Sequence, residues 1–202
     1  MIQVIVQIKT KKMKNIVLIL SVFLSFSCKA QSTISLEQAY QYSKTSDGIP
    51  TTVTYVKDIN NKLDQFVGTW KGSYNGKNYE FQFIKKINFG EHSIKWDEIV
   101  GRFIIKDNTG TVQYNSISEV DDSKTRFRGI KLQNRAYIMS FVGNYDCLES
   151  GNVFIETRKN NPNEMILFYS QDKDGLLNPA KCPNFSSFVP LLPQEKIVLT
   201  KQ

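Results

Sequence analysis

Strict alternation of apolar and polar residues is the feature that most limits what this chain can fold into. In "FVGTWKGSY", at residues 66–74, every second side chain falls on one face of an extended strand. The Asn75–Gly76 dipeptide that follows is a strong hairpin signal, and "NYEFQFIKK", at residues 78–86, repeats the alternation. The paired strands therefore share one inward aromatic face, whose members are Phe66, Trp70, Tyr74, Tyr79, Phe81 and Phe83.

Further strand patterns follow at short intervals, separated by turn signals such as "DNTG" and "KNNPNE". They cover residues 94–106, 111–116, 125–132, 136–143, 152–158, 165–170 and 196–201. No long helical pattern lies between them, which excludes a parallel sheet because its strands need crossover helices. The sequence therefore predicts an all-β fold of about eight to nine antiparallel strands, either a sandwich or a β-barrel, with a short N-terminal helical segment.

Residues 1–28 have the layout of an export signal. Lysines precede an apolar run at residues 16–26, and small or polar residues follow it. The run has 11 residues, whereas a helix that crosses a bilayer needs about 20. Translation from Met13 would give a signal of ordinary proportions, so Met1 and Met13 both remain candidate starts.

The end of this signal, "LSFSC" at residues 24–28, resembles a bacterial lipobox, although Ser25 stands where that motif usually has leucine. The resemblance implies that Cys28 becomes the first residue of a lipoprotein and receives a lipid anchor, so that a membrane is its partner. The alternative is signal-peptidase cleavage after Ala30, which would release a soluble periplasmic or secreted protein. The whole layout resembles small lipoproteins of the Gram-negative cell envelope.

Beyond the signal, the polar residues 29–54 are predicted to be a tether, which leaves residues 55–202 as the barrel domain. Within the tether, Ser35 and Gln38 form a capping-box pattern that predicts a short helix at residues 36–42. A second helical turn is predicted at residues 58–65.

Two cysteines, Cys147 and Cys182, remain in the exported chain, and both lie in loop-like contexts. Disulfides persist outside the cytoplasm, so we expect these two to pair. The segment at residues 171–194, which contains Cys182, has four prolines, which are incompatible with a central strand and predict a loop.

The stretch "LDQFVGTWKGSY" resembles the G-x-W motif of lipocalin-like barrels through Gly68 and Trp70. The resemblance implies a barrel whose closed end is covered by Trp70, beneath a basic residue of the last strand, Lys196 or Lys201. The T-D-Y motif of lipocalins has no clear counterpart here. A barrel of about eight strands is just wide enough to be filled by side chains or to hold one small ligand.

Two functions are therefore compatible with the sequence. The first is a lipid-anchored barrel that binds a small apolar ligand through Tyr74, Tyr79, Phe81 and Phe83. The second is a packed interaction or structural module, such as an inhibitor or assembly partner, without a small-molecule ligand.

No catalytic constellation, metal site or cofactor motif is predicted, so we do not expect an enzyme. His92 is the only histidine, and its place in a turn-like stretch favours an exposed loop. The "SQDKDG" stretch starts like a calcium loop, but Lys181 stands where that loop needs glutamate. The net charge of +7 includes four lysines ahead of Cys28, so the mature chain carries about +3 and gives no reason to expect nucleic-acid binding.

Overall fold

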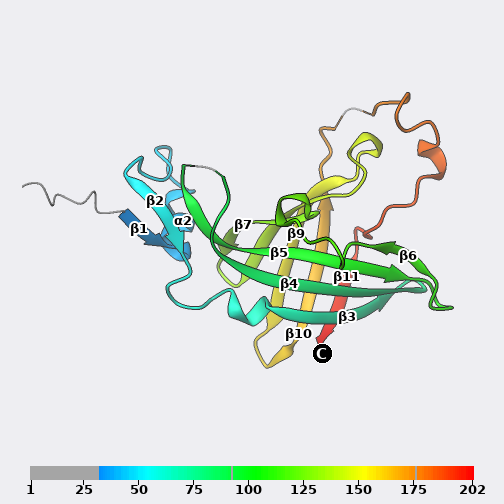
Figure 1. Ribbon diagram of the computed structural model, residues 1–202, viewed down its shortest axis with the longest axis horizontal. Helices are drawn as coiled ribbons and strands as arrows, with labels where there is room; N and C mark the ends of the chain where they lie inside the picture. Colours follow the sequence, from blue (N-terminus) through cyan, green and yellow to red (C-terminus); the bar gives the residue numbers. More distant parts are fainter. Residues whose placement is uncertain (1–31, 92, 176) are drawn as a thin grey trace, which may run out of the picture. The chain divides into compact units, whose positions relative to one another are not determined.

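Eight antiparallel strands close into a barrel in the computed structural model, which describes residues 32–91, 93–175 and 177–202 (Figure 1). They are β3 (Gly68–Tyr74), β4 (Lys77–Phe89), β5 (Lys95–Lys106), β7 (Phe127–Gln133), β8 (Ala136–Val142), β9 (Ser150–Arg158), β10 (Asn161–Gln171) and β11 (Lys196–Lys201). Neighbours run in the order β5, β4, β3, β11, β10, β9, β8 and β7, and β7 pairs back onto β5 at Gly101–Phe127. The predicted all-β antiparallel barrel, lipocalin-like in strand number and closure, is confirmed.

The predicted hairpin between β3 and β4 is confirmed in its register. Trp70 lies opposite Phe81, and Asn75 and Gly76 form the turn with φ angles of 45° and 72°. Positive φ at both central residues matches the right-handed twist of the strands, which is why Asn-Gly favours this turn.

Three further strands add to one edge of the long strand β5. They are β1 (Ser32–Ser35), β2 (Val53–Lys57) and β6 (Val112–Asn115). β1 and β2 pair in parallel, and β2 continues in parallel onto the start of β5, whereas β6 pairs antiparallel with its far end. The helix α2 (Leu36–Tyr42) joins β1 to β2 and packs against β7.

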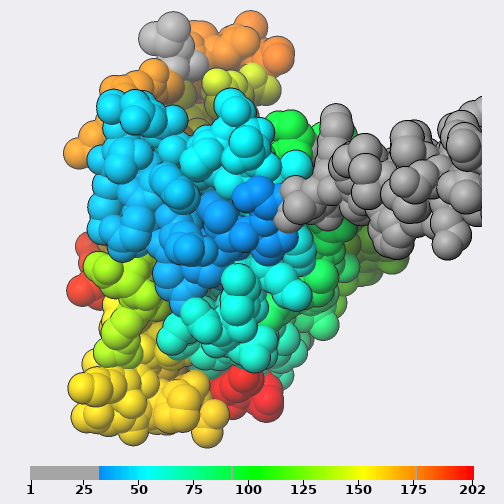
Figure 2. All heavy atoms as spheres, turned by 90° about the vertical axis from the view of Figure 1, so that its left-hand side faces the viewer, coloured from blue at the N-terminus to red at the C-terminus, as the bar shows by residue number. Residues whose placement is uncertain are grey.

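The segment from β1 to β2 covers one end of the barrel, which we call the capped end. Figure 2 faces this end and shows the blue and cyan atoms of that segment gathered over it. Ile34, Leu36, Ala39 and Val53 are buried there and join the main hydrophobic core. Their apolar surface is removed from water, which stabilises the cap on the barrel.

The structure differs from the predicted polar tether at residues 29–54, because residues 32–54 belong to the folded unit. Few apolar residues are spread through this stretch, so its composition suggested a solvated linker. The helix predicted within it is confirmed together with its capping box. The Gln38 backbone N–H donates to Ser35 Oγ at 3.1 Å, and the Ser35 N–H donates to Gln38 Oε1 at 2.8 Å.

The second predicted helical turn is shorter and later than expected, a single 3₁₀ turn η1 (Asp64–Phe66). The buried side chain of Asp58 explains the difference. It accepts the backbone N–H groups of Lys62 at 2.7 Å and Leu63 at 2.9 Å, and it pairs with Lys85 Nζ at 2.8 Å. These side-chain bonds satisfy donors that a helix would otherwise use.

Aromatic rings fill the barrel interior. Phe81 has no exposed surface, and its ring centroid lies 5.7 Å from that of Phe103 and 5.9 Å from those of Phe83 and Phe127. Tyr79 stacks on the other side of Phe81 at 6.1 Å. Rings at these separations are in packing contact, so the predicted inward face of β3 and β4 forms a solid core.

The two residues predicted to close the barrel lie at the capped end. Trp70 is completely buried, and its indole N–H donates to the carbonyl oxygen of Phe66 at 2.8 Å. Gly68 has a φ of 123°, a region that side chains with a Cβ adopt only under strain. The chain uses this conformation where η1 turns into β3.

Candidate functional site

The end of the barrel opposite the cap, which we call the rim, is built from loops. Its main element is the connection between β10 and β11, residues 172–195, which we call the strap (orange to red in Figure 1). Its described part contains only one 3₁₀ turn, η4 (Phe185–Ser187), so the predicted loop is confirmed. The predicted disulfide between Cys147 and Cys182 is also present, with a Cα–Cα distance of 5.4 Å, and it ties the strap to the rim.

Glu149 holds the strap at a second point. This carboxylate is only 2% exposed; Oε2 accepts the backbone N–H of Asn144 at 3.0 Å, and Oε1 accepts that of Leu191. Burial raises the pKa of Glu149, and the backbone donors oppose this rise only in part. One side chain therefore connects the loop before β9 to the end of the strap.

Between the strap and the β3–β4 turn lies an open hollow of about 290 Å³, which we call the rim groove. Its walls are Tyr74, Asn75, Lys77 and Tyr79 on the barrel side and Pro190, Leu192, Pro193 and Gln194 on the strap side. Lys77 Nζ donates to the Pro190 carbonyl at 3.5 Å across the groove. Burial raises the pKa of Tyr79 to about 12, so its phenol stays neutral at physiological pH.

Two of the four predicted ligand residues, Tyr74 and Tyr79, thus meet in one hollow. The other two, Phe81 and Phe83, lie in the packed core with at most 1% exposure and do not line the rim groove. Any ligand contact with them would require displacement of neighbouring rings.

The strap half of the rim groove was missed in the sequence. The run "PLLP" at residues 190–193 was the one sequence feature that indicated packing of this loop against the barrel, because two leucines between prolines are unusual in a solvated loop. Leu192 is in fact completely buried.

A smaller hollow of about 160 Å³ shares Pro190, Leu192 and Gln194 with the rim groove. Phe185, Phe188 and Pro190 form its apolar side, and Glu149 and Gln171 form its polar side. Gln171 is fixed there because its amide donates to the carbonyl oxygen of Leu148 at 2.6 Å.

Several sequence expectations concern residues at other places. Arg128 on β7 pairs with Glu98 at 2.8 Å, and its guanidinium carbon lies 4.9 Å from the centre of the Phe89 ring. Cys28 and His92 lie outside the described residues. Within the part of the chain that the structure describes, no group of three or more His, Cys, Asp and Glu side chains is placed to hold a metal ion. The described helices include none that is long and apolar enough to span a bilayer.

Comparison with known proteins identifies the family. The model of a family of unknown function, DUF6705, matches residues 13–156, which include the apolar signal-like stretch, the cap and most of the barrel. Neither the curated proteins nor the solved structures contain a match to the chain. Because the family model covers more than half of the sequence, the chain belongs to the DUF6705 family.

Proposed function

We propose that the protein is an exported, lipid-anchored binding protein of the Gram-negative envelope, not an enzyme, and that its packed barrel serves as a scaffold for a binding surface at the rim. One observation carries the proposal. The interior that a ligand carrier would leave open is occupied by contacting rings around Phe81. Binding is therefore assigned to the rim groove, where Tyr74 and Tyr79 meet the strap.

The chemistry of this groove suits a small apolar ligand. Tyr74, Pro190 and Pro193 offer accessible apolar surface beside the buried Tyr79 and Leu192, and the Tyr74 phenol adds a polar tip that tolerates water. At about 290 Å³, the groove is close to the lower limit of about 300 Å³ for small-molecule pockets.

A lipid anchor at Cys28 would also orient the barrel. The folded unit starts at Ser32, four residues after Cys28, and a chain of that length spans at most about 14 Å. Because Ser32 begins the cap, an anchored protein would keep its capped end near the membrane. The rim groove would then be open to the aqueous compartment.

Native mass spectrometry of the mature protein, purified from its own membrane fraction, tests ligand binding. We expect a discrete added mass that is lost in Tyr74→Ala, since the half-exposed Tyr74 ring forms one groove wall. Tyr145→Ala is the matched control, because Tyr145 is 70% exposed and does not line the groove. An added mass that survives Tyr74→Ala would contradict the rim site.

A second function is a packed interaction module without a small-molecule ligand. Apolar side chains on the outer face of the barrel favour it. Phe154 and Phe168 lie opposite each other on β9 and β10, with ring centroids 6.2 Å apart, and Val198 on β11 is 47% exposed. The absence of any added mass from the wild-type protein would favour this function.

A further inference from the structure

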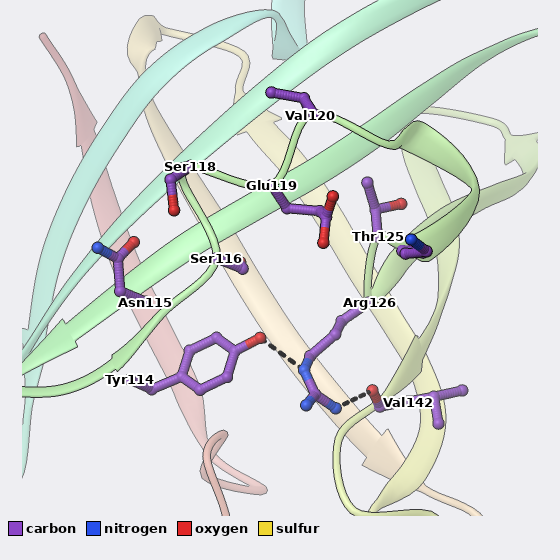
Figure 3. A pocket seen from close by; sticks show the side chains of 10 residues that line it. Tyr114, Asn115, Ser116, Ser118, Glu119, Val120, Thr125, Arg126 and Val142 are labelled. Atoms are coloured by element: carbon purple, nitrogen blue, oxygen red, sulfur yellow. Dashed lines mark hydrogen bonds between the residues drawn. The ribbon is translucent and has the colours of Figure 1, made fainter.

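The barrel has a polar hollow beside β5, at the place where the strand that pairs with β5 changes from β7 to β6. β7 pairs with β5 at Gly101, β6 pairs with it at Ile104, and residues 116–126 leave the sheet between them. This excursion encloses an open pocket of about 690 Å³, which we call the seam pocket. In Figure 3, the side chains of Tyr114 and Arg126 point toward each other, and Glu119 is seen above this pair.

Arg126 is fixed in the wall of this pocket. Its Nε–H donates to Tyr114 Oη at 2.5 Å, and its Nη1 donates to the carbonyl oxygens of Val142, at 2.9 Å, and Gly143. The guanidinium carbon also lies 5.2 Å from the centre of the Tyr114 ring. The guanidinium is therefore held in one orientation before any ligand arrives.

Arg126 differs from the other four arginines of the chain in its partners. Each of those pairs with a carboxylate in the described structure: Arg102 with Asp122, Arg128 with Glu98, Arg135 with Glu156 and Arg158 with Glu164. The acceptors of Arg126 are a phenol and two backbone carbonyls, which are all neutral. Because a guanidinium stays protonated, a partly buried positive charge remains there with no directly bonded carboxylate among the described residues, although it acts at longer range on Glu149, whose pKa it lowers.

The remaining donors at this place suit an anion. The contacts of Arg126 among described residues involve Nε and Nη1, which leaves Nη2 for a ligand. The Tyr114 hydroxyl accepts from Arg126, so its own proton is available to a further acceptor. Ser118 adds a hydroxyl to the lining, and Lys124, which pairs with Asp121 at 3.3 Å, adds a second cation.

We propose that the seam pocket binds a small, hydroxyl-bearing polar molecule through an anionic group, carboxylate or phosphate, on Arg126. The Glu119 carboxylate limits the net positive charge of the pocket, and it offers an acceptor to the ligand's hydroxyl groups. The site is separate from the rim groove and does not depend on a ligand there.

Titration of the ¹⁵N-labelled protein, followed at the Arg126 Nε–H signal, tests this site. The probes are glucuronate and inorganic phosphate, with glucose as the uncharged control, all at constant ionic strength. We expect a saturable shift with glucuronate or phosphate and none with glucose, and the stronger of the two anions identifies the group. Equal responses to glucuronate and glucose, or no response to either anion, would overturn the proposal.

Variants separate binding from folding. Arg126→Gln should weaken anion binding at least about tenfold, because hydrogen bonds to charged groups contribute about 1.5–3 kcal/mol. Arg135→Gln, at the opposite end of the barrel, is the matched control and should leave affinity unchanged. If Arg126→Gln does not fold, Glu119→Gln decides the question.

Glu119→Gln keeps the Oε1 that accepts the Asp121 N–H at 2.9 Å, and it removes a negative charge from the pocket. It should therefore bind inorganic phosphate, which carries no alcohol group for Glu119 to accept, several-fold more tightly. Unchanged or weaker binding by this variant would refute a role for Arg126 as the anion receptor.

Discussion

Lys201, on the last strand, places its ammonium nitrogen 5.3 Å from the centre of the Trp70 ring on the first strand of the barrel. A Cβ on Gly68 would lie 3.1 Å from Lys201 Cε, so the glycine leaves room for the lysine stem. The lipocalin-like motif implied a basic residue from the last strand at this place, with Lys196 and Lys201 as candidates. The structure selects Lys201, and the pair links the two strands that meet at the capped end.

Trp70→Ala should lower the free energy of unfolding by about 3–5 kcal/mol, because it leaves a large cavity in the closed end and removes the bond to Phe66. Urea unfolding followed by circular dichroism measures this loss. The control is Trp96→Ala on β5, whose side chain is only partly buried. An equal or larger loss for Trp96→Ala would show that the closed end is not the critical position.

Removal of the disulfide, by the double change Cys147→Ser and Cys182→Ser, should destabilise the protein. The sequence separation of 35 corresponds to about 4 kcal/mol in the chain-entropy model. Thermal unfolding measures the loss, and limited proteolysis should show earlier cleavage within the strap. The Glu149–Leu191 contact remains in this variant, so cleavage is expected first near Cys182. An unchanged melting temperature would contradict this account.

Glu149 should make stability depend on pH in an unusual direction. Burial raises its pKa above the ordinary value of 4.5, so the folded state binds this proton more tightly than the unfolded chain does. The contribution of Glu149 to stability is fully present below its pKa in the unfolded chain. This contribution is lost as pH rises through the higher pKa that Glu149 has in the folded state. The difference in unfolding free energy between wild type and Glu149→Gln should therefore fall as pH rises above the ordinary value of 4.5. A constant difference would contradict the raised pKa.

Asp122 is the matched control with the opposite sign. Burial acts to raise the pKa of the Asp122 carboxyl group. The hydrogen bonds and positive charges of Lys86 and Arg102 lower it by more, so the net shift is downward. Its contribution is present above the unfolded pKa and is lost as pH falls through the folded pKa. The stability advantage of wild type over Asp122→Asn should therefore shrink in acid. An advantage that grows in acid would be inconsistent with these ion pairs.

Cys28→Ser tests the lipid anchor directly. We expect the wild-type protein in the membrane fraction, with an intact mass that includes acyl chains beginning at Cys28. The variant should be found in the soluble fraction or remain unprocessed. A soluble wild-type product that begins at Gln31 would instead support signal-peptidase cleavage after Ala30.

Local patterns predicted much of this molecule because the information lies between close neighbours in sequence. Alternation set the inward face of β3 and β4, the Asn75–Gly76 turn set their register, and Ser35 with Gln38 set the start of α2. The disulfide was predictable because two cysteines allow only one intramolecular pair once Cys28 is set aside.

Tertiary structure alone decided the features that depend on distant partners. The cap looked like a tether because its few apolar residues, among them Ile34 and Val53, become a core only against the barrel end. The rim groove needs the strap folded back onto Tyr74, and the seam pocket needs Arg126 to reach the end of β8. Alternation in the sequence also left open whether the barrel interior holds a ligand or only side chains. It shows which face of the strand an aromatic ring lies on, but not how much space remains between the rings. Packing around Phe81 answered that question, because ring separations arise only when all eight strands close.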